Sequence, residues 1–175
     1  MIPAPKHLKN YVFPIDSIKD DNVFLGAVHC SCGNETFELL YPGQTKDVNG
    51  LTIPCTAEFE GHYFFLVKAF CTRCEKEHLL FDKDLHGWDG FICHDEEQAS
   101  LPRPPLIKWK CLSCNGLEHR CFIRIYNQTK QEFVIEVGNE INENSWPNAF
   151  EWFSMSITCC KCKLETEAWI DYETA

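Results

Sequence analysis

Four closely spaced pairs of cysteines constrain this chain more than any other feature of its sequence. Eight of its 12 cysteines fall into the pairs Cys30/Cys32, Cys71/Cys74, Cys111/Cys114 and Cys159/Cys162. A Cys-x-x-Cys turn directs two thiolates at one centre about 2.3 Å away, and two such turns complete the tetrahedron that zinc prefers. The spacing therefore predicts two zinc sites, each held by four thiolates.

Paired cysteines bind metal or form disulfides according to the compartment of the protein. The stretch Met1–Asn10 has no apolar core of signal-peptide length. The longest apolar run, Tyr63–Val67, is far shorter than the roughly 18 residues that span a bilayer. We therefore expect a cytoplasmic protein without a membrane anchor, in which the thiols stay reduced and free to bind metal.

The predicted ligands divide into one early and one late pair for each of two Zn²⁺ ions per chain. The first ion is assigned to Cys30, Cys32, Cys71 and Cys74, and the second to Cys111, Cys114, Cys159 and Cys162. Two alternatives stay open. His29 could replace Cys30, because it stands three residues before Cys32, as in a Cys-x-x-Cys pair, and Cys160 could replace Cys159 as the ligand. The sequence also leaves open whether the metal is zinc or iron.

Three further cysteines lie outside these pairs in sequence that reads as strand or strand edge. They are Cys55, Cys93 and Cys121. A free cysteine in such a place behaves as a small apolar residue, so we expect all three to pack in the core.

The two halves of the chain read as two copies of one unit. Aromatic-rich segments, 62–70 and 150–158, lead into the late pair of each half. Between the halves, residues 94–105 are first acidic and then rich in proline, which is typical of a linker. We predict an N-terminal unit at 1–95, a linker at 96–105 and a C-terminal unit at 106–175. Units this small bury little core, and a metal ion commonly compensates.

Short β-branched and aromatic runs predict an all-β chain with antiparallel strands. The expected strands are 22–29, 36–41, 63–70, 120–126, 132–137 and 150–158. Turns are expected at Asn49-Gly50, Glu60-Gly61 and Asp89-Gly90. No helix of three or more turns is predicted.

The order knuckle, strands, knuckle, strand resembles the zinc ribbon group, here in tandem. The resemblance rests on Cys30-Ser-Cys32-Gly33, Cys71-Thr-Arg-Cys74, Cys111-Leu-Ser-Cys114-Asn-Gly116 and Cys159-Cys-Lys-Cys162. The first knuckle departs from the pattern by being Cys-x-Cys, and the loops between knuckles are long. The segment 79–90 is also similar to uncharacterised bacterial ribbon proteins. The resemblance implies a fold and no activity.

A site closed by four thiolates offers no open position to water or substrate, so we predict no catalytic and no cofactor-binding residues and no enzyme activity. The leading hypothesis is a structural double zinc ribbon that mediates protein–protein interaction. Trp88 and Trp146 lie in loop-like sequence, where each either is exposed to a partner or caps its own core.

Two alternative functions remain at this level. A basic stretch with interleaved aromatic residues, at Lys108, Lys110, Arg120 and Arg124, favours nucleic-acid binding, but the net charge of −10 opposes it. A thiol redox switch through Cys30, Cys32, Cys71 and Cys74 is the other, because their order is similar to that in the redox-regulated bacterial heat-shock chaperone.

Overall fold

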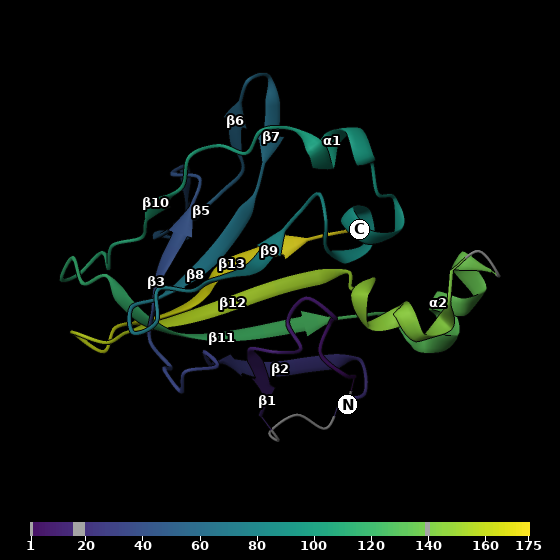
Figure 1. The fold of residues 1–175 in the computed structure, drawn as a ribbon, viewed down its shortest axis with the longest axis horizontal. Coiled ribbons are helices and arrows are strands. Elements are labelled where there is room, and N and C mark those ends of the chain that lie inside the picture. Colours follow the sequence, from purple (N-terminus) through teal and green to yellow (C-terminus); the bar gives the residue numbers. More distant parts are fainter. Residues whose placement is uncertain (1, 16–19, 139–140) are drawn as a thin grey trace.

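The computed structural model describes residues 2–15, 20–138 and 141–175, in which the chain is mainly antiparallel β-structure (Figure 1). The strands are β1 (Val12–Pro14), β2 (Val23–Val28), β3 (Phe37–Tyr41), β4 (Thr45–Val48), β5 (Leu51–Pro54), β6 (Ala57–Phe59), β7 (His62–Phe64), β8 (Leu66–Cys71), β9 (Glu77–Asp82), β10 (Ile107–Lys108), β11 (Glu118–Tyr126), β12 (Trp152–Cys159) and β13 (Glu165–Glu173). The helices are α1 (Glu96–Ser100) and α2 (Lys130–Val137), with a π-helical turn at Trp88–Ile92 and a 3₁₀ turn at Glu143–Asn148. The prediction of an antiparallel β chain is confirmed.

Two three-stranded units with the same plan form the body of the sheet. In the first, β3 pairs with β8 and β8 with β9; in the second, β11 pairs with β12 and β12 with β13. A cysteine pair precedes β3 and β11, and another lies in the turns β8–β9 and β12–β13. This shared plan supports the interpretation of two copies of one unit.

Strand β11 joins the two units into one sheet. One of its edges pairs with β12, from His119 to Tyr126. The other edge pairs with β3 through Glu118 and His119 and with β2 from Phe122 onward. The division into units at 1–95 and 106–175 stays a prediction, because the structure shows strands from both sides of the linker hydrogen-bonded in one sheet.

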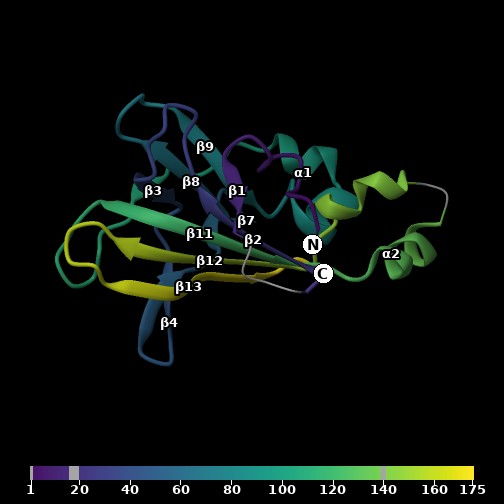
Figure 2. The ribbon, with the colours of Figure 1, turned by 90° about the horizontal axis from the view of Figure 1, so that it is seen from below.

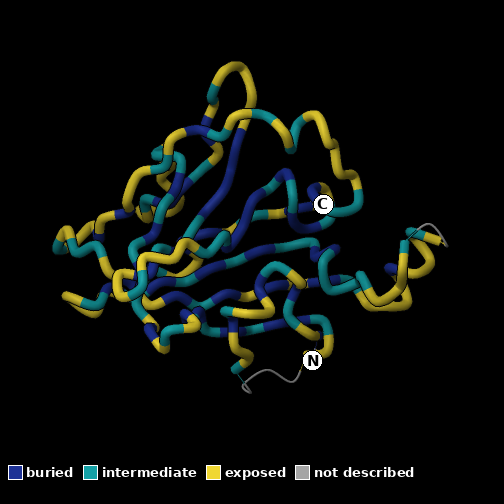
Figure 3. Tube along the Cα trace, in the orientation of Figure 1, coloured by how far each residue is buried: buried dark blue, intermediate teal, exposed yellow. Residues whose placement is uncertain are grey.

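Aromatic side chains fill the space between the two units. Tyr172 of β13 stacks on Phe65 with ring centroids 4.9 Å apart, and Phe153 of β12 stacks on Phe81 of β9 at 4.7 Å. Trp169 is fully buried on the same strand as Tyr172. Figure 3 shows the buried positions concentrated along the central strands, and Figure 2 shows α2 extending from the end opposite the knuckles.

Local signals explain where the predicted secondary structure is right and where it is wrong. Asn49-Gly50 and Glu60-Gly61 form the predicted hairpin turns with positive φ at both residues. The run 63–70 is interrupted at Phe65, which separates β7 from β8. Asp89-Gly90 is not a strand turn, because it lies inside the π-helical turn.

The predicted strand at 132–137 is wrong, because these residues belong to helix α2. Thr129 accepts a hydrogen bond from the Glu132 N–H, and the Glu132 carboxylate accepts one from the Thr129 N–H. This capping box begins a helix, which ends at Gly138 with a φ of 60°. The apolar residues of this segment suggest a strand, whereas the capping box at its start indicates a helix.

The predicted linker is partly ordered and attached to the sheet. Asp95 caps α1 by accepting hydrogen bonds from two backbone N–H groups. Arg103 forms ion pairs with the buried carboxylates of Asp82 and Asp84 at the end of β9.

Among the described residues, no helix is long and apolar enough to cross a membrane.

Two stacked histidines fix the N-terminal segment to the sheet. The rings of His7 and His86 lie 3.6 Å apart and nearly parallel. His7 Nε2 contacts the Leu80 carbonyl at 3.2 Å, and His86 Nδ1 accepts a hydrogen bond from the Asp82 N–H. Burial lowers the pKa of His7 to about 4 and that of His86 to about 2, so both rings are neutral in the folded chain.

We expect the protein to lose stability steeply as the pH falls below about 6.5. His7 and His86 bind protons there in the unfolded chain but stay neutral in the folded chain, so acid favours unfolding. A histidine whose pKa is lowered by folding contributes its full stabilisation at pH values above its ordinary pKa. Below that pH, each such histidine lowers the free energy of unfolding by about 1.4 kcal/mol per pH unit. His7→Phe keeps an aromatic ring on His86 and removes one titrating group, so its slope between pH 6.5 and pH 5 should be shallower. His62→Gln changes an exposed histidine and should leave the slope unchanged. Urea unfolding at several pH values measures both, and equal slopes in His7→Phe and the unsubstituted chain contradict the prediction.

Candidate metal centres

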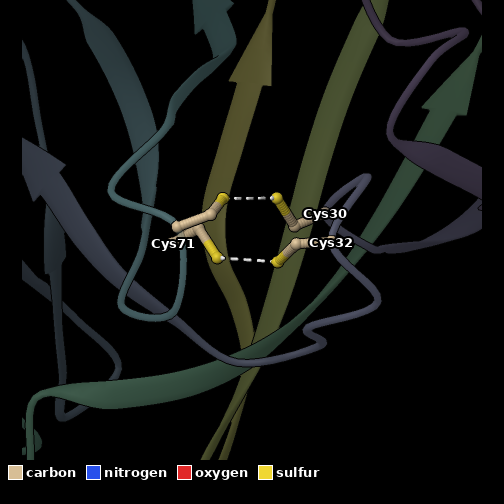
Figure 4. A group of neighbouring side chains, drawn as sticks. Cys30, Cys32 and Cys71 are labelled. Atoms are coloured by element: carbon tan, nitrogen blue, oxygen red, sulfur yellow. Dashed lines mark hydrogen bonds between the residues drawn. The ribbon is translucent and has the colours of Figure 1, made fainter.

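The first four-cysteine group lies where two neighbouring turns of the first unit meet. Cys30 and Cys32 follow β2, Cys71 ends β8, and Cys74 lies in the turn to β9. All four sulfurs lie within 4.8 Å of one another. Cys30 Sγ is 3.3 Å from Cys74 Sγ, and Cys32 Sγ is 3.6 Å from Cys71 Sγ. Figure 4 shows the side chains of Cys30 and Cys32 directed toward the turn that begins at Cys71.

The second group repeats this arrangement in the second unit. Cys111 and Cys114 precede β11, Cys159 ends β12, and Cys162 lies in the turn to β13. Their sulfurs also lie within 4.8 Å of one another. The two closest pairs are Cys111 with Cys162 at 3.5 Å and Cys114 with Cys159 at 3.6 Å.

The sulfur–sulfur distances identify the kind of site. A disulfide bond is about 2.05 Å long, whereas two thiolates on one zinc ion, each about 2.3 Å from it, are roughly 3.8 Å apart. The observed distances of 3.3–3.6 Å lie close to the second value, and all the cysteines are free. Each group thus has the size and the donor set to hold one metal ion.

Three of the four knuckles have the same backbone. In each, the N–H of the first cysteine donates to the carbonyl five residues later, and its own carbonyl accepts from the N–H four residues later. The residue at that fourth position has a φ of 61°, 56° or 63°. These knuckles are Cys71–Lys76, Cys111–Gly116 and Cys159–Leu164.

The first knuckle is the same turn shortened by one residue. The Cys30 N–H donates to the Asn34 carbonyl, and the Cys30 carbonyl accepts from the Gly33 N–H. Gly33 takes the left-handed position with a φ of 80°. The Cys-x-Cys spacing, which departs from the zinc ribbon pattern, is therefore matched by a backbone that is one residue tighter.

Hydrogen bonds in each group stabilise one thiolate and hold a proton on another thiol. Burial raises the pKa of Cys71, but hydrogen bonds from the Cys74 and Arg73 amides and from Asn34 outweigh it and lower this pKa to about 6. In the second group, burial and the neighbouring sulfurs raise the pKa of Cys114 to about 12. Four thiolates this close repel one another, so a bound cation is what allows all four to ionise together.

The alternative ligands lie outside both groups. His29 Nδ1 is 3.7 Å from the Glu35 carboxylate. Cys160 does not belong to the group that contains Cys159, and its N–H donates to the Glu118 carbonyl. The structure thus brings together the eight cysteines that the spacing selects.

One residue near the first group was missed by the sequence analysis. His78 Nε2 lies 3.3 Å from Cys30 Sγ. Pairing of β8 with β9 brings it there, opposite Ala69, from 48 residues away in the chain. No local spacing signals such a contact, because it depends on the strand register.

The three remaining cysteines differ in their surroundings. Cys121 is buried inside β11, as expected. Cys55 is half-buried, and Cys93 is exposed. The expectation of core packing is therefore wrong for Cys93, which follows the π-helical turn rather than lying in a strand.

The basic stretch is largely matched by acidic neighbours or covered. Lys108 Nζ lies 2.6 Å from the Glu38 carboxylate, and Arg120 lies 3.8 Å from that of Glu35. Trp109 is only 4% exposed, so its ring is not open to a nucleic-acid base.

The two candidate interface tryptophans contact their own surroundings. Trp88 meets Phe133 of α2 edge-to-face. Trp146 Nε1 donates a hydrogen bond to the Gln128 carbonyl. Both are half-buried, which favours a role in covering their own local core over exposure to a partner.

We expect Gly116→Ala to weaken metal retention at the second group alone. A Cβ atom there would lie 3.0 Å from Cys159 Sγ and 3.2 Å from Cys114 Sγ, closer than ordinary contact. Displaced ligands commonly cost about tenfold or more in metal affinity, so one of two metal ions should leave faster to a chelator. Ser113→Ala, at an exposed position of the same knuckle, is the matched control. Equal release rates from the two variants, followed with a colorimetric zinc indicator, contradict the prediction.

No family model, curated protein or solved structure matches the chain.

Proposed function

We propose that each four-cysteine group binds one Zn²⁺ ion and that the chain is a metal-stabilised protein-binding module. The observation that supports this best is the pair of matched four-cysteine groups, each built from two knuckles, in which the closest sulfur pairs are 3.3–3.6 Å apart. Four thiolates in tetrahedral array suit zinc, and they also suit iron, so zinc is the finer part of the proposal.

The proposed role of the metal is structural rather than catalytic. Four protein ligands fill the coordination shell of zinc, which leaves no position for a water molecule or a substrate. Each group ties the loop before a central strand to a neighbouring hairpin turn, so metal binding fixes the register of three strands at once. We accordingly propose that the chain is not an enzyme and works in the cytoplasm, where its thiols stay reduced.

The proposed partner is another protein. The net charge of −10 and the acidic neighbours of Lys108 and Arg120 disfavour nucleic acid. Exposed apolar side chains favour protein contact, including Ile135 at 75%, Tyr63 at 61% and Leu112 at 58% exposure.

Metal content tests the proposal directly. Native mass spectrometry of protein purified with a reductant should show two zinc ions per chain, and elemental analysis should find no iron. Cys93→Ser, outside both groups, should keep both ions, and Cys114→Ser should bind fewer than two. Metal-free protein that remains folded, or an iron absorption spectrum, would overturn the proposed zinc sites.

A further inference from the structure

The outer face of strands β11, β12 and β13 carries an aromatic pair beside a hollow. Alternate residues of β11 are buried, which leaves Tyr126 on the opposite face, where it is 38% exposed. Tyr126 lies directly opposite Trp152 of β12 in the antiparallel register, so both rings stand on this face. They line a cavity of about 560 Å³.

Acidic side chains form the rest of that cavity. Glu151, Asp171 and Glu173 line it together with Ser154. Asp171 accepts a hydrogen bond from Trp152 Nε1, which fixes the indole ring within the wall. Among the described residues that line the cavity, none is a lysine or an arginine. The cavity therefore combines aromatic walls with carboxylates and holds no cation of its own.

Carboxylates of α2 add to the negative potential at the cavity. Burial raises the pKa of Glu151, and the nearby carboxylates of Glu136 and Glu132 on α2 raise it further. Arg124 donates to the Tyr126 hydroxyl and lines the neighbouring hollow rather than the acidic cavity. A positive group placed in the cavity would be attracted by the ring faces and by the carboxylates together.

A second hollow continues from the first along the same face. It measures about 300 Å³, shares Ser154 with the acidic cavity, and is lined by Phe122, Arg124 and Glu167 among others. Two adjoining hollows along neighbouring strands suit successive side chains of an extended peptide, because alternate residues of such a peptide point to one side.

We propose that this face, the β11–β13 face, binds an extended basic segment of a partner protein and that the acidic cavity receives a lysine or arginine side chain. This inference rests on the protein-binding part of the proposed function and adds the chemistry of the partner. The charge of the cavity and its aromatic walls select a cationic side chain and repel phosphate.

The test is a titration of the zinc-loaded chain of residues 1–175, followed by NMR through the indole N–H signal of Trp152. The probe is the capped peptide Ser-Lys-Ser-Lys-Ser, and the same peptide with glutamate in place of lysine is the negative probe. Glu151→Gln/Glu173→Gln removes two charges from the cavity. Glu96→Gln/Glu165→Gln removes two charges from exposed positions outside it and leaves the same net charge.

We expect the lysine peptide to shift the Trp152 signal and to bind about tenfold more weakly to Glu151→Gln/Glu173→Gln. The control variant should bind it as the unsubstituted chain does. Equal binding by the two variants, equal binding of the glutamate peptide, or no shift at all would each refute the inference. Zinc content, measured on the same samples, tests the proposed metal sites separately. Failure of the inference with two zinc ions bound therefore leaves the metal-binding part of the proposed function standing.

Discussion

Replacing Cys71 by serine is expected to remove the first zinc ion and to unfold the chain near room temperature. Cys71 is fully buried at the end of β8, and it accepts a hydrogen bond from Asn34 within the first group. Structural zinc sites supply about 10–16 kcal/mol of apparent binding energy in small domains, and whole domains are stable by only about 5–15 kcal/mol. Loss of one site therefore removes most of the free energy that separates the folded chain from the unfolded chain.

The measurement combines zinc content with thermal unfolding followed by circular dichroism. Cys121→Ala is an informative control, because it changes a cysteine that is equally buried but lies outside both groups. It should keep two zinc ions and lose only about 1–2 kcal/mol of stability, as small core truncations do. If Cys71→Ser melts at the same temperature as Cys121→Ala, the first group does not stabilise the fold through a metal ion.

The two cysteine groups could be predicted because each knuckle is a local structure. A turn of five or six residues determines where its two sulfurs point, and this information lies within one stretch of sequence. The hairpin turns at Asn49-Gly50 and Glu60-Gly61 were predictable for the same reason, since Asn49 and the two glycines favour positive φ. The zinc assignment itself stays a proposal, while the grouping of the eight cysteines is a property of the structure.

Features that depend on distant parts of the chain could not be predicted. The contact of His78 with Cys30 and the stacking of His7 on His86 each join segments that are more than 40 residues apart. The joining of both units through β11 is of the same kind, because nothing in residues 118–126 specifies which strands will lie on each edge. The acidic and proline-rich composition of the predicted linker suggests two separate units, but strands on both sides of it pair in one sheet.

Because β11 joins the units, we expect neither fragment 1–100 nor fragment 101–175 to fold stably by itself. The second fragment would lose the partners of one β11 edge, which are β2 and β3. It would also expose Phe153 and Tyr172, whose rings stack on Phe81 and Phe65 of the first fragment. Each large side chain brought into water costs about 1.5–3 kcal/mol, and the open β11 edge leaves backbone groups unpaired. A fragment with so small a core should therefore keep no well-packed fold around its metal site.

The matched control is the intact chain with a protease site inserted after Ser100, an exposed residue at the end of α1. Cleavage of the folded protein should leave both fragments together on a sizing column, because the strand pairs and the ion pairs of Arg103 with Asp82 and Asp84 do not depend on the cut bond. Separated in denaturant and refolded with zinc, each fragment alone should give poorly dispersed NMR spectra, and the mixture should recover the native one. A dispersed spectrum with one bound zinc ion from fragment 101–175 alone would instead show that the second unit is an independent domain and that the pairing with β2 and β3 is an interface between two domains.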